Sequence, residues 1–507
     1  MDQTVNRTAR IAKNTLMLYF RMFILLLVGL YTSRVVLDAL GENDYGVYNV
    51  IGSVVAMFTI ISGALNSAVT RFITFEMGKG CEARLNKVYS TAVTIQLILA
   101  MVVVAVAEPV GLWFINNEMT IDPARIPAAR MVLHFSLLAF VFNLMSVPQM
   151  ASITAHEKMS AYAYIGILDG LLRLVAALMI MHSSGDRLVY YAALMCGAVL
   201  VVRLTYGIYC RINFEECRYR PVMDASLIRE MFSFAGWNFI GVTSGVLREY
   251  GGNILVNLFY GTAVNAARGV AVQLNGAIQG FVTNFMTAVN PQITKSYAAG
   301  ENEYMFILVR KSSRMSFYLL FVLALPVLFN TEFILSIWLK EVPSHTVLFV
   351  QLFLMFALSE SLSNPLITAM LATGKIRDYQ LIVGGLQLLN LPVSYIFLKM
   401  GAMPEVTVVV AIVISQVCFF VRLYMLGRMT GLKICHFLRC VYLNVIKVSV
   451  VAVAASAISS SICSGSFIMF CLNILLCLVA AGLSVLLVGC GKDERKEMLK
   501  FIKRRGA

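Results

Sequence analysis

Long apolar runs, most of them 20 or more residues in length, follow one another along almost the whole chain. A helix of about 20 residues crosses the hydrocarbon core of a bilayer, whereas barrel strands have about 10 residues of alternating polarity. The runs therefore exclude a barrel and predict an all-α polytopic membrane protein with about fourteen transmembrane helices. The expected spans lie near residues 14–39, 45–70, 87–108, 127–150, 160–182, 188–210, 232–258, 263–289, 311–333, 345–370, 378–399, 405–427, 441–462 and 466–490.

Composition and charge agree with this class. Of the 507 residues, 59% are hydrophobic and 13% are charged, whereas soluble domains have about 25% charged residues. The net charge of +14 does not indicate nucleic acid as a partner, because the basic residues lie in short connections between spans. Under the positive-inside rule, this distribution predicts that both termini are cytoplasmic, which requires an even number of spans.

Cysteine and histidine show no pattern that would hold a metal or a cofactor. The 11 cysteines include no CxxC pair, and the five histidines are scattered, so we expect neither a metal site nor a cofactor. The first apolar run is too long for a signal peptide and lacks a small-residue cleavage site, so we expect it to remain as the first span.

The stretch from Ser233 to Gln292 places charged and amide side chains inside two apolar runs that meet near residues 261–264. An ionised residue at the bilayer centre costs roughly 2.5–3.5 kcal/mol on insertion scales, so such residues must face water, a partner or a ligand. The charged residues are Arg248, Glu249 and Arg268, and the amides are Asn238, Asn253, Asn257, Asn265, Asn275 and Gln279.

Helical spacing places most of these side chains on one stripe in each run. Single amides in membranes often join neighbouring helices, but two stripes that face each other across a hairpin predict a hydrophilic cavity. Arg248 lies about 17 residues into its span, too deep to reach the interface easily, so we predict that it faces this cavity. Arg268 lies within about two turns of a span end, where it could either snorkel to the interface or face the cavity.

One further arginine and two pairs of opposite charge also lie in the spans. Arg21 could snorkel or face the cavity, for the same reason as Arg268. Arg34 and Asp38 are four residues apart, so the pair could be neutralised on one helix. The same spacing separates Asp169 from Arg173.

An internal repeat divides the chain. Pro148, Ala155, Lys158 and Tyr162 recur at one common offset as Pro365, Ala372, Lys375 and Tyr379; Val202-Arg203-Leu204 recurs at nearly the same offset as Val421-Arg422-Leu423, and Leu40-Gly41 is echoed by Tyr260-Gly261. These offsets predict two six-span lobes, residues 1–215 and 226–430, related by an axis along the membrane normal. Residues 431–507 would add two spans and a basic tail. That tail is either an amphipathic helix on the inner leaflet or a solvated basic end.

The first hairpin, from Tyr19 to Thr74, contains a recognisable pattern. It reads Thr32-x-Arg34, Leu37, Leu40-Gly41, Tyr45-Gly46-x-Tyr48, then Ser53, Gly63, Asn66 and Arg71. The pattern resembles the opening of the polysaccharide transporter family, the O-antigen and capsule-repeat flippases of the MOP superfamily, which are related to MATE exporters and lipid II flippases. The span count and the repeat extend this resemblance over the whole chain.

The resemblance implies two pseudo-symmetric six-helix lobes around a central cavity, plus two C-terminal helices. It implies that the protein moves undecaprenyl-diphosphate-linked repeat units of O-antigen, capsule or exopolysaccharide across the bacterial cytoplasmic (inner) membrane. Related lipid II flippases use cavity arginines on corresponding helices, which supports Arg21, Arg34, Arg248 and Arg268 as substrate-binding residues. Besides the substrate and membrane lipids, the implied partners are a polysaccharide polymerase and glycosyltransferases. A groove that involves the last two spans is implied for the lipid tail.

The charges in the spans suit such a substrate. Guanidinium groups form bidentate, charge-assisted hydrogen bonds with phosphate oxygens, and the amide stripes could hydrogen-bond sugars. Duplicated lobes around a cavity predict alternating access, in which the lobes rock around the bound substrate. The return step would use an ion gradient or the membrane potential, and Glu249, Asp169 and Glu360 are the acids that could take up an ion or serve as structural partners.

Two alternatives come from other classes. A MATE-type multidrug exporter takes organic cations, and proton-coupled members use an acid in the first span; here that span has Arg21 and no acid before Asp38. A membrane polymerase, ligase or glycosyltransferase would present catalytic residues in a large loop, but the longest connection, near 211–231, has only about 20 residues and no nucleophile–base arrangement.

Overall fold

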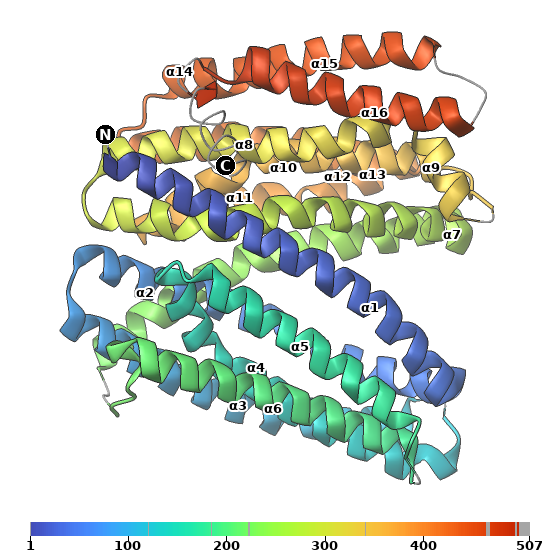
Figure 1. Ribbon diagram of the computed structural model, residues 1–507. Helices are drawn as coiled ribbons and strands as arrows, with labels where there is room; N and C mark the ends of the chain where they lie inside the picture. Colours follow the sequence, from blue (N-terminus) through green and yellow to red (C-terminus); the bar gives the residue numbers. More distant parts are fainter. Residues whose placement is uncertain are drawn as a thin grey trace, which may run out of the picture. The chain divides into compact units, whose positions relative to one another are not determined.

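Helices are the only regular elements that the structure, a computed structural model, contains within its described residues. Those residues are 2–119, 121–183, 185–221, 224–339, 341–462, 467–491 and 494–495. An apolar chain in a bilayer must pair its backbone groups internally, and an α-helix does so within one segment. The expected all-α class is therefore confirmed (Figure 1).

The chain forms two compact units, one of Arg10–Val242 (the N-unit) and one of Thr243–Ala507 with Met1–Ala9 (the C-unit). The N-unit contains most of α1 (Asp2–Ala56), then α2 (Thr59–Lys79), α3 (Glu82–Asn117), the 3₁₀ turn η1 (Pro123–Arg125), α4 (Ile126–Ala155), α5 (Met159–Ile180), α6 (Arg187–Asn213) and the 3₁₀ turn η2 (Glu215–Cys217). The helix α7 (Ala225–Ala298) begins in the N-unit and ends in the C-unit.

The C-unit continues through nine further helices and two helical turns within its described residues. They are α8 (Asn302–Phe329), α9 (Thr331–Trp338), α10 (Thr346–Thr373), α11 (Arg377–Leu388), α12 (Asn390–Lys399), α13 (Val406–Thr430), α14 (Ile434–Phe437), α15 (Leu443–Ile462) and α16 (Phe467–Ser484), with π-helical turns η3 (Leu438–Tyr442) and η4 (Val485–Gly489). The predicted amphipathic tail helix lies outside the described residues, apart from positions 494 and 495.

Eleven helices in the described part of the chain are long and apolar enough to cross a membrane. They account for eleven of the fourteen expected spans. The other three expected spans, 45–70, 232–258 and 263–289, also lie on helices. The first is interrupted at residues 57–58, between α1 and α2, and the other two are the halves of α7, which contain the polar stripes.

One central helix organises each unit. In the N-unit, α4 packs against α2, α3 and α6, and in the C-unit, α10 packs against α8 and α13. The N-unit core consists largely of small and branched aliphatic side chains from α1, α3, α4 and α6. In the C-unit, α16 packs on both α8 and α15, and Figure 1 shows α15 and α16 side by side.

Polar contacts attach the last two long helices to α8. Asn473 Nδ2 donates to Asn330 Oδ1 at 3.0 Å, and Tyr318 donates from its hydroxyl to Asn444 Oδ1 at 2.6 Å. Glu494, near the end of the described chain, also contacts α8: its Oε1 lies 2.5 Å from Nη2 of Arg314. These contacts run along most of α8, so α15 and α16 are part of the C-unit and not a separate domain.

Backbone irregularities recur at the offset of the sequence repeat. Gly41 (φ 75, ψ 170) bends α1, and Gly261 (φ 79, ψ −172), its counterpart in the repeat, bends α7. Gly80 and Gly300, which are separated by the same offset as Gly41 and Gly261, both have positive φ. The helix-interior prolines 148 and 365, which also correspond in the repeat, lie in α4 and α10. The division into halves at 215 and 226 remains a prediction, because the compact units separate within α7.

Candidate substrate-binding site

A hairpin made by the two halves of α7 contains most of the polar stretch. The chain reverses at Gly261, whose φ of 79 and ψ of −172 are open to glycine but strained for other residues. Across this bend, Arg268 Nη1 donates to Asn253 Oδ1 at 3.1 Å, and Nη2 donates to the carbonyl of Glu249 at 3.0 Å. Two predicted cavity residues therefore bind each other and fix the hairpin.

Arg268 is only 6% exposed, and its guanidinium lies 5.4 Å from the ring centroid of Phe353 on α10. The side chain also lies close to Gly252, where an added Cβ would be 3.1 Å from Nη2. Two of its five N–H donors have partners within the hairpin. That Arg268 also faces a cavity stays a prediction.

Arg248 has a different environment, although it lies on the same hairpin. Its guanidinium carbon lies 4.8 Å from the ring centroid of Phe356, and the residue is half-buried. Within the described ranges, Arg248 makes no hydrogen bond and no ion pair. Neighbouring residues on a helix do not face one another, and Glu249, which is exposed, forms no ion pair in the described chain. Arg248 is therefore a cation with unused donors inside a membrane-spanning hairpin.

The remaining amides of the stripes divide into two groups. Asn265 and Asn275 are half-buried, and each has a side-chain oxygen that is buried without a hydrogen-bond partner in the part of the chain that the structure describes. Gln279 is also half-buried, whereas Asn257 is exposed. Buried amide oxygens normally have partners, so Asn265 and Asn275 are suited to accept hydrogen bonds from water or from a hydroxyl-rich ligand.

Glu360, on α10, belongs to a chain of hydrogen bonds inside the C-unit. Ser415 donates to Glu360 Oε1 at 2.5 Å and lies 2.9 Å from the hydroxyl of Ser359. Gln416 Nε2 donates to that same Ser359 oxygen at 2.6 Å, and Tyr442 donates to Gln416 Oε1 at 3.1 Å. The predicted ion-coupling acid is therefore connected to the turn that precedes α15.

A second arginine accompanies Glu360. Arg422 on α13 is only 2% exposed, and its Nη1 lies 3.9 Å from Glu360 Oε1. Its Nε and Nη1 are buried and have no hydrogen-bond partner within the described residues. From the sequence, Arg422 was recognisable only as a member of the internal repeat.

The N-unit contains the other predicted site residues, and each of them except Arg34 has a structural partner. Arg21 lies over the ring of Tyr162 at 4.6 Å and packs directly against Gly166, where a Cβ would overlap its Nε. Asp169 pairs with Arg173 at 3.0 Å, as the four-residue spacing allowed. The buried Asn238 donates to the carbonyl of Ala64 at 3.4 Å.

Arg34 and Asp38 have the same four-residue spacing as Asp169 and Arg173, with a different result. Both side chains are exposed, and no ion pair joins them within the described residues. Arg34 is therefore available to a ligand, and it does not stabilise its helix through Asp38.

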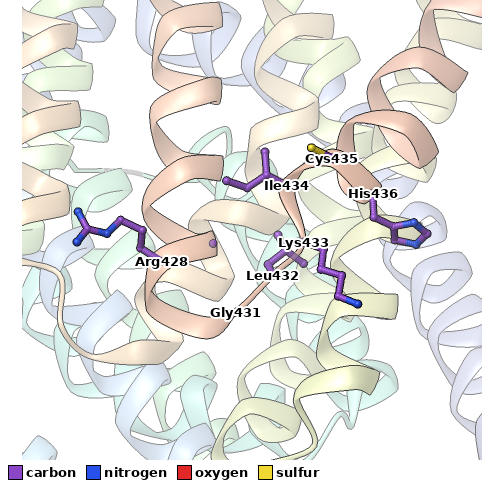
Figure 2. A pocket seen from close by; sticks show the side chains of 8 residues that line it. Arg428, Gly431, Leu432, Lys433, Ile434, Cys435 and His436 are labelled. Atoms are coloured by element: carbon purple, nitrogen blue, oxygen red, sulfur yellow. The ribbon is translucent and has the colours of Figure 1, made fainter.

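A pocket elsewhere in the C-unit does not contain any of these residues. It lies at the turn between α13 and α14 and is lined by Gly427, Arg428, Gly431, Leu432, Lys433, Ile434, Cys435 and His436. Figure 2 shows the side chains of Arg428, Lys433 and His436 pointing in different directions. Ligand sites have convergent polar groups, so this pocket is a surface hollow at a helix connection.

Comparisons with known proteins place this geometry in context. Residues 11–297, more than half of the chain, match the sequence profile of a family described as polysaccharide biosynthesis proteins. No curated protein matches the chain significantly.

Solved structures share the fold over 84–85% of this chain. An outward-facing multidrug resistance MATE family transporter of the MOP superfamily superimposes with a TM-score of 0.70 at 12% identity, over 85% of this chain and 97% of that one. A MATE protein in complex with MaD3S gives 0.71 at 12% identity, over 84% and 97%. A MOP superfamily transporter from Pyrococcus furiosus, described as having a binding pocket of reverse polarity that suggests a different function, gives 0.67 at 12% identity, over 84% and 96%. At such low identity, the likeness shows the fold.

Proposed function

This chain belongs to the family of polysaccharide biosynthesis proteins, and from that premise we propose that it is a flippase for lipid-linked oligosaccharides. Its cargo would be repeat units linked to undecaprenyl diphosphate, moved across the bacterial cytoplasmic membrane by alternating access. The fold shared with MOP-superfamily transporters supports a transport function, and the family supports a substrate from polysaccharide biosynthesis.

The observation that carries the proposal is that Arg248 has no ion pair and no hydrogen bond among the described residues. A cation within a membrane span is costly. In the described chain no carboxylate forms an ion pair with Arg248, and no side-chain or backbone oxygen accepts a hydrogen bond from its N–H groups. Its donors are therefore open to an anionic ligand that enters the hairpin. A diphosphate suits a guanidinium because its oxygens accept two parallel, charge-assisted hydrogen bonds.

The other candidates take secondary roles in this proposal. Arg21 and Arg34, which belong to the N-unit, remain candidate substrate-binding residues in this proposal. Arg268 would mainly hold the hairpin and contribute its remaining donors. Asn257, Asn265, Asn275 and Gln279 would contact sugar hydroxyls.

Charge favours this substrate over the organic cations that multidrug exporters take. A cation would be repelled by Arg248 and Arg21, and the three candidate acids offer little compensation. Asp169 is paired with Arg173, and Glu360 lies near Arg422. Glu249 is the acid without an ion pair in the described residues, so we propose it first as the residue that would respond to a coupling ion.

Complementation in a strain that lacks its own flippase tests the proposal. Arg248→Ala and Arg248→Lys would be compared with Arg211→Ala, which removes an exposed arginine from the end of α6. We expect Arg248→Ala to insert normally but to lose surface polymer, with lipid-linked repeat units accumulating inside the cell. Lysine should restore part of the export, because it keeps the charge and loses the fork. Normal export by Arg248→Ala would contradict the proposed phosphate site.

A further inference from the structure

One face of α10 presents aromatic rings to both arginines of the α7 hairpin. Phe353 and Phe356 are three residues apart, so they lie on the same side of the helix. The ring of Phe353 faces Arg268 at 5.4 Å, and the ring of Phe356 faces Arg248 at 4.8 Å. Glu360, four residues after Phe356, continues this face toward Arg422. A single helix therefore contacts three buried or half-buried arginines, two through rings and one near a carboxylate.

The two kinds of contact have different consequences for a guanidinium. A carboxylate neutralises its charge and occupies its N–H donors, which makes the arginine a structural residue. An aromatic face attracts the cation through the ring quadrupole, without cancelling the charge or accepting its in-plane hydrogen bonds. A ring can thus hold an arginine inside a membrane span and leave it ready to bind an anion.

The two arginines of the hairpin differ in whether they have partners besides an aromatic ring. Arg268 has a ring contact together with two hydrogen bonds across the hairpin. Arg248 has the ring contact without a hydrogen bond or an ion pair in the described residues. The ring of Phe356 is therefore the main feature that determines where the free cation of the hairpin lies.

We propose that Phe356 is a positioning residue for substrate recognition: its ring holds the guanidinium of Arg248 as an unneutralised, open fork for the diphosphate of the lipid-linked substrate. This inference rests on the proposed function, because it requires a diphosphate ligand. The inference assigns a role to Phe356, which acts through Arg248 and does not touch the ligand. It also explains why an aromatic side chain is needed at position 356.

The test measures binding of radiolabelled undecaprenyl diphosphate to the purified full-length protein in detergent. The variants are Arg248→Ala, Phe356→Leu, Phe356→Trp and the wild-type sequence with mono-, di- or trifluorinated phenylalanine at position 356. Fluorine withdraws electron density from the ring face and changes the size of the ring only slightly, so the series weakens the cation–π attraction without emptying the site. Phe321→Leu on α8 is the matched control, because this buried ring stacks on Phe317.

We expect Phe356→Leu to weaken binding about 2- to 30-fold, the range that corresponds to measured cation–π energies. Tryptophan should retain affinity, and successive fluorines should lower it stepwise. Phe321→Leu should leave affinity unchanged. If Phe356→Leu fails to fold, the fluorinated series still decides the question, since it preserves packing.

Two results would overturn the inference, and they can be told apart. If Arg248→Ala weakens binding but fluorination has no effect, the proposed function stands and Phe356 only fills space. If Arg248→Ala binds as tightly as the wild type, the proposed phosphate site is wrong, and the role of Phe356 is rejected with it.

Discussion

Arg268 Nη1 lies 3.1 Å from Asn253 Oδ1, and this contact joins the two halves of α7 across the bend at Gly261. A second donor of the same guanidinium binds the carbonyl of Glu249. The hairpin therefore contains an internal polar clamp as well as a free cation at Arg248. The two arginines, which look alike in the sequence, should respond differently to mutation.

Removing the clamp should reduce stability. Interhelical hydrogen bonds in membrane proteins contribute about 0.6 kcal/mol on average and up to about 1.7 kcal/mol each, so Arg268→Ala should lose roughly 1–3 kcal/mol. Asn253→Ala should lose less, because the bond to the Glu249 carbonyl remains. Thermal unfolding of the purified protein in detergent would measure both.

Arg248→Ala is the comparison for this prediction, since it removes the same side chain from the same hairpin without breaking a hydrogen bond. It should unfold close to the wild-type temperature. If Arg268→Ala were as stable as Arg248→Ala, the two bonds across the bend would not contribute to the fold.

The bend itself requires glycine. At Gly261 the φ of 79 is strained for any residue with a Cβ, although a Cβ there would have no heavy atom within 4 Å. Gly261→Ala should therefore cost about 1–3 kcal/mol through backbone strain alone. Gly41→Ala should cost a similar amount, because Gly41 has nearly the same conformation and equally open surroundings. Thermal unfolding would again be the measurement.

A helical glycine on the same hairpin provides the control. Gly269 also has no atom within 4 Å of an added Cβ, but its φ is not positive. Gly269→Ala should be neutral or stabilising by up to about 1 kcal/mol, because alanine loses less conformational entropy in a helix. Equal destabilisation at positions 261 and 269 would show that space, and not backbone conformation, limits these sites.

Much of this organisation could be predicted from the sequence, because it depends on local rules. Apolar run length indicated the helical class, and the internal repeat paired Gly41 with Gly261, although it did not predict the backbone conformation that they share. The four-residue spacing of Asp169 and Arg173 allowed their ion pair. Each of these follows from one segment or from a comparison of two segments.

The contacts of the candidate site were harder to predict, because they join residues on different helices. Counting turns along α7 placed Arg268 and Asn253 on stripes but could not show that one binds the other across the bend. Phe353 and Phe356 gave no signal, since the chain has 31 phenylalanines, most of them in apolar runs. Only the packing of α10 against the hairpin distinguishes these two.

The buried Arg422 should depend on Glu360. Removing one partner of a buried charge pair leaves the other without compensation, which typically costs about 3–5 kcal/mol. Glu360→Gln should lie near the lower end, about 3 kcal/mol, because the Glu360 side chain is 19% exposed and its Oε1 lies 3.9 Å from Arg422 Nη1. The double variant Glu360→Gln/Arg422→Gln should be more stable than Glu360→Gln alone. Losses that simply add in the double variant would show that the two groups do not interact.

A pH-dependent contact lies outside the spans of the N-unit, where the connection after α4 meets the turn η2. The ring of His156 stacks on Phe214 with centroids 4.0 Å apart, and its Nε2 lies 2.6 Å from Glu216 Oε1 in η2. Burial alone would raise the pKa of Glu216. The hydrogen bond and charge of His156, together with a backbone hydrogen bond, outweigh burial and lower this pKa below its ordinary value of 4.5.

The direction of this shift determines how stability depends on pH. A carboxyl group whose pKa is lower in the folded state stabilises the fold above its unfolded pKa, and this contribution disappears as the pH falls through the folded pKa. The segment 214–218 should therefore exchange its amide hydrogens faster as the pH drops below about 4.5, once the intrinsic pH dependence of exchange is corrected. In His156→Ala, the histidine no longer offsets burial, so the pKa of Glu216 should rise toward or above its unfolded value and the acid-induced loss of protection should shrink or disappear. Glu215→Gln, which removes an exposed neighbouring carboxylate, is the control and should keep the wild-type profile. An unchanged profile in His156→Ala would mean that the backbone hydrogen bond, and not the histidine, sets the pKa of Glu216.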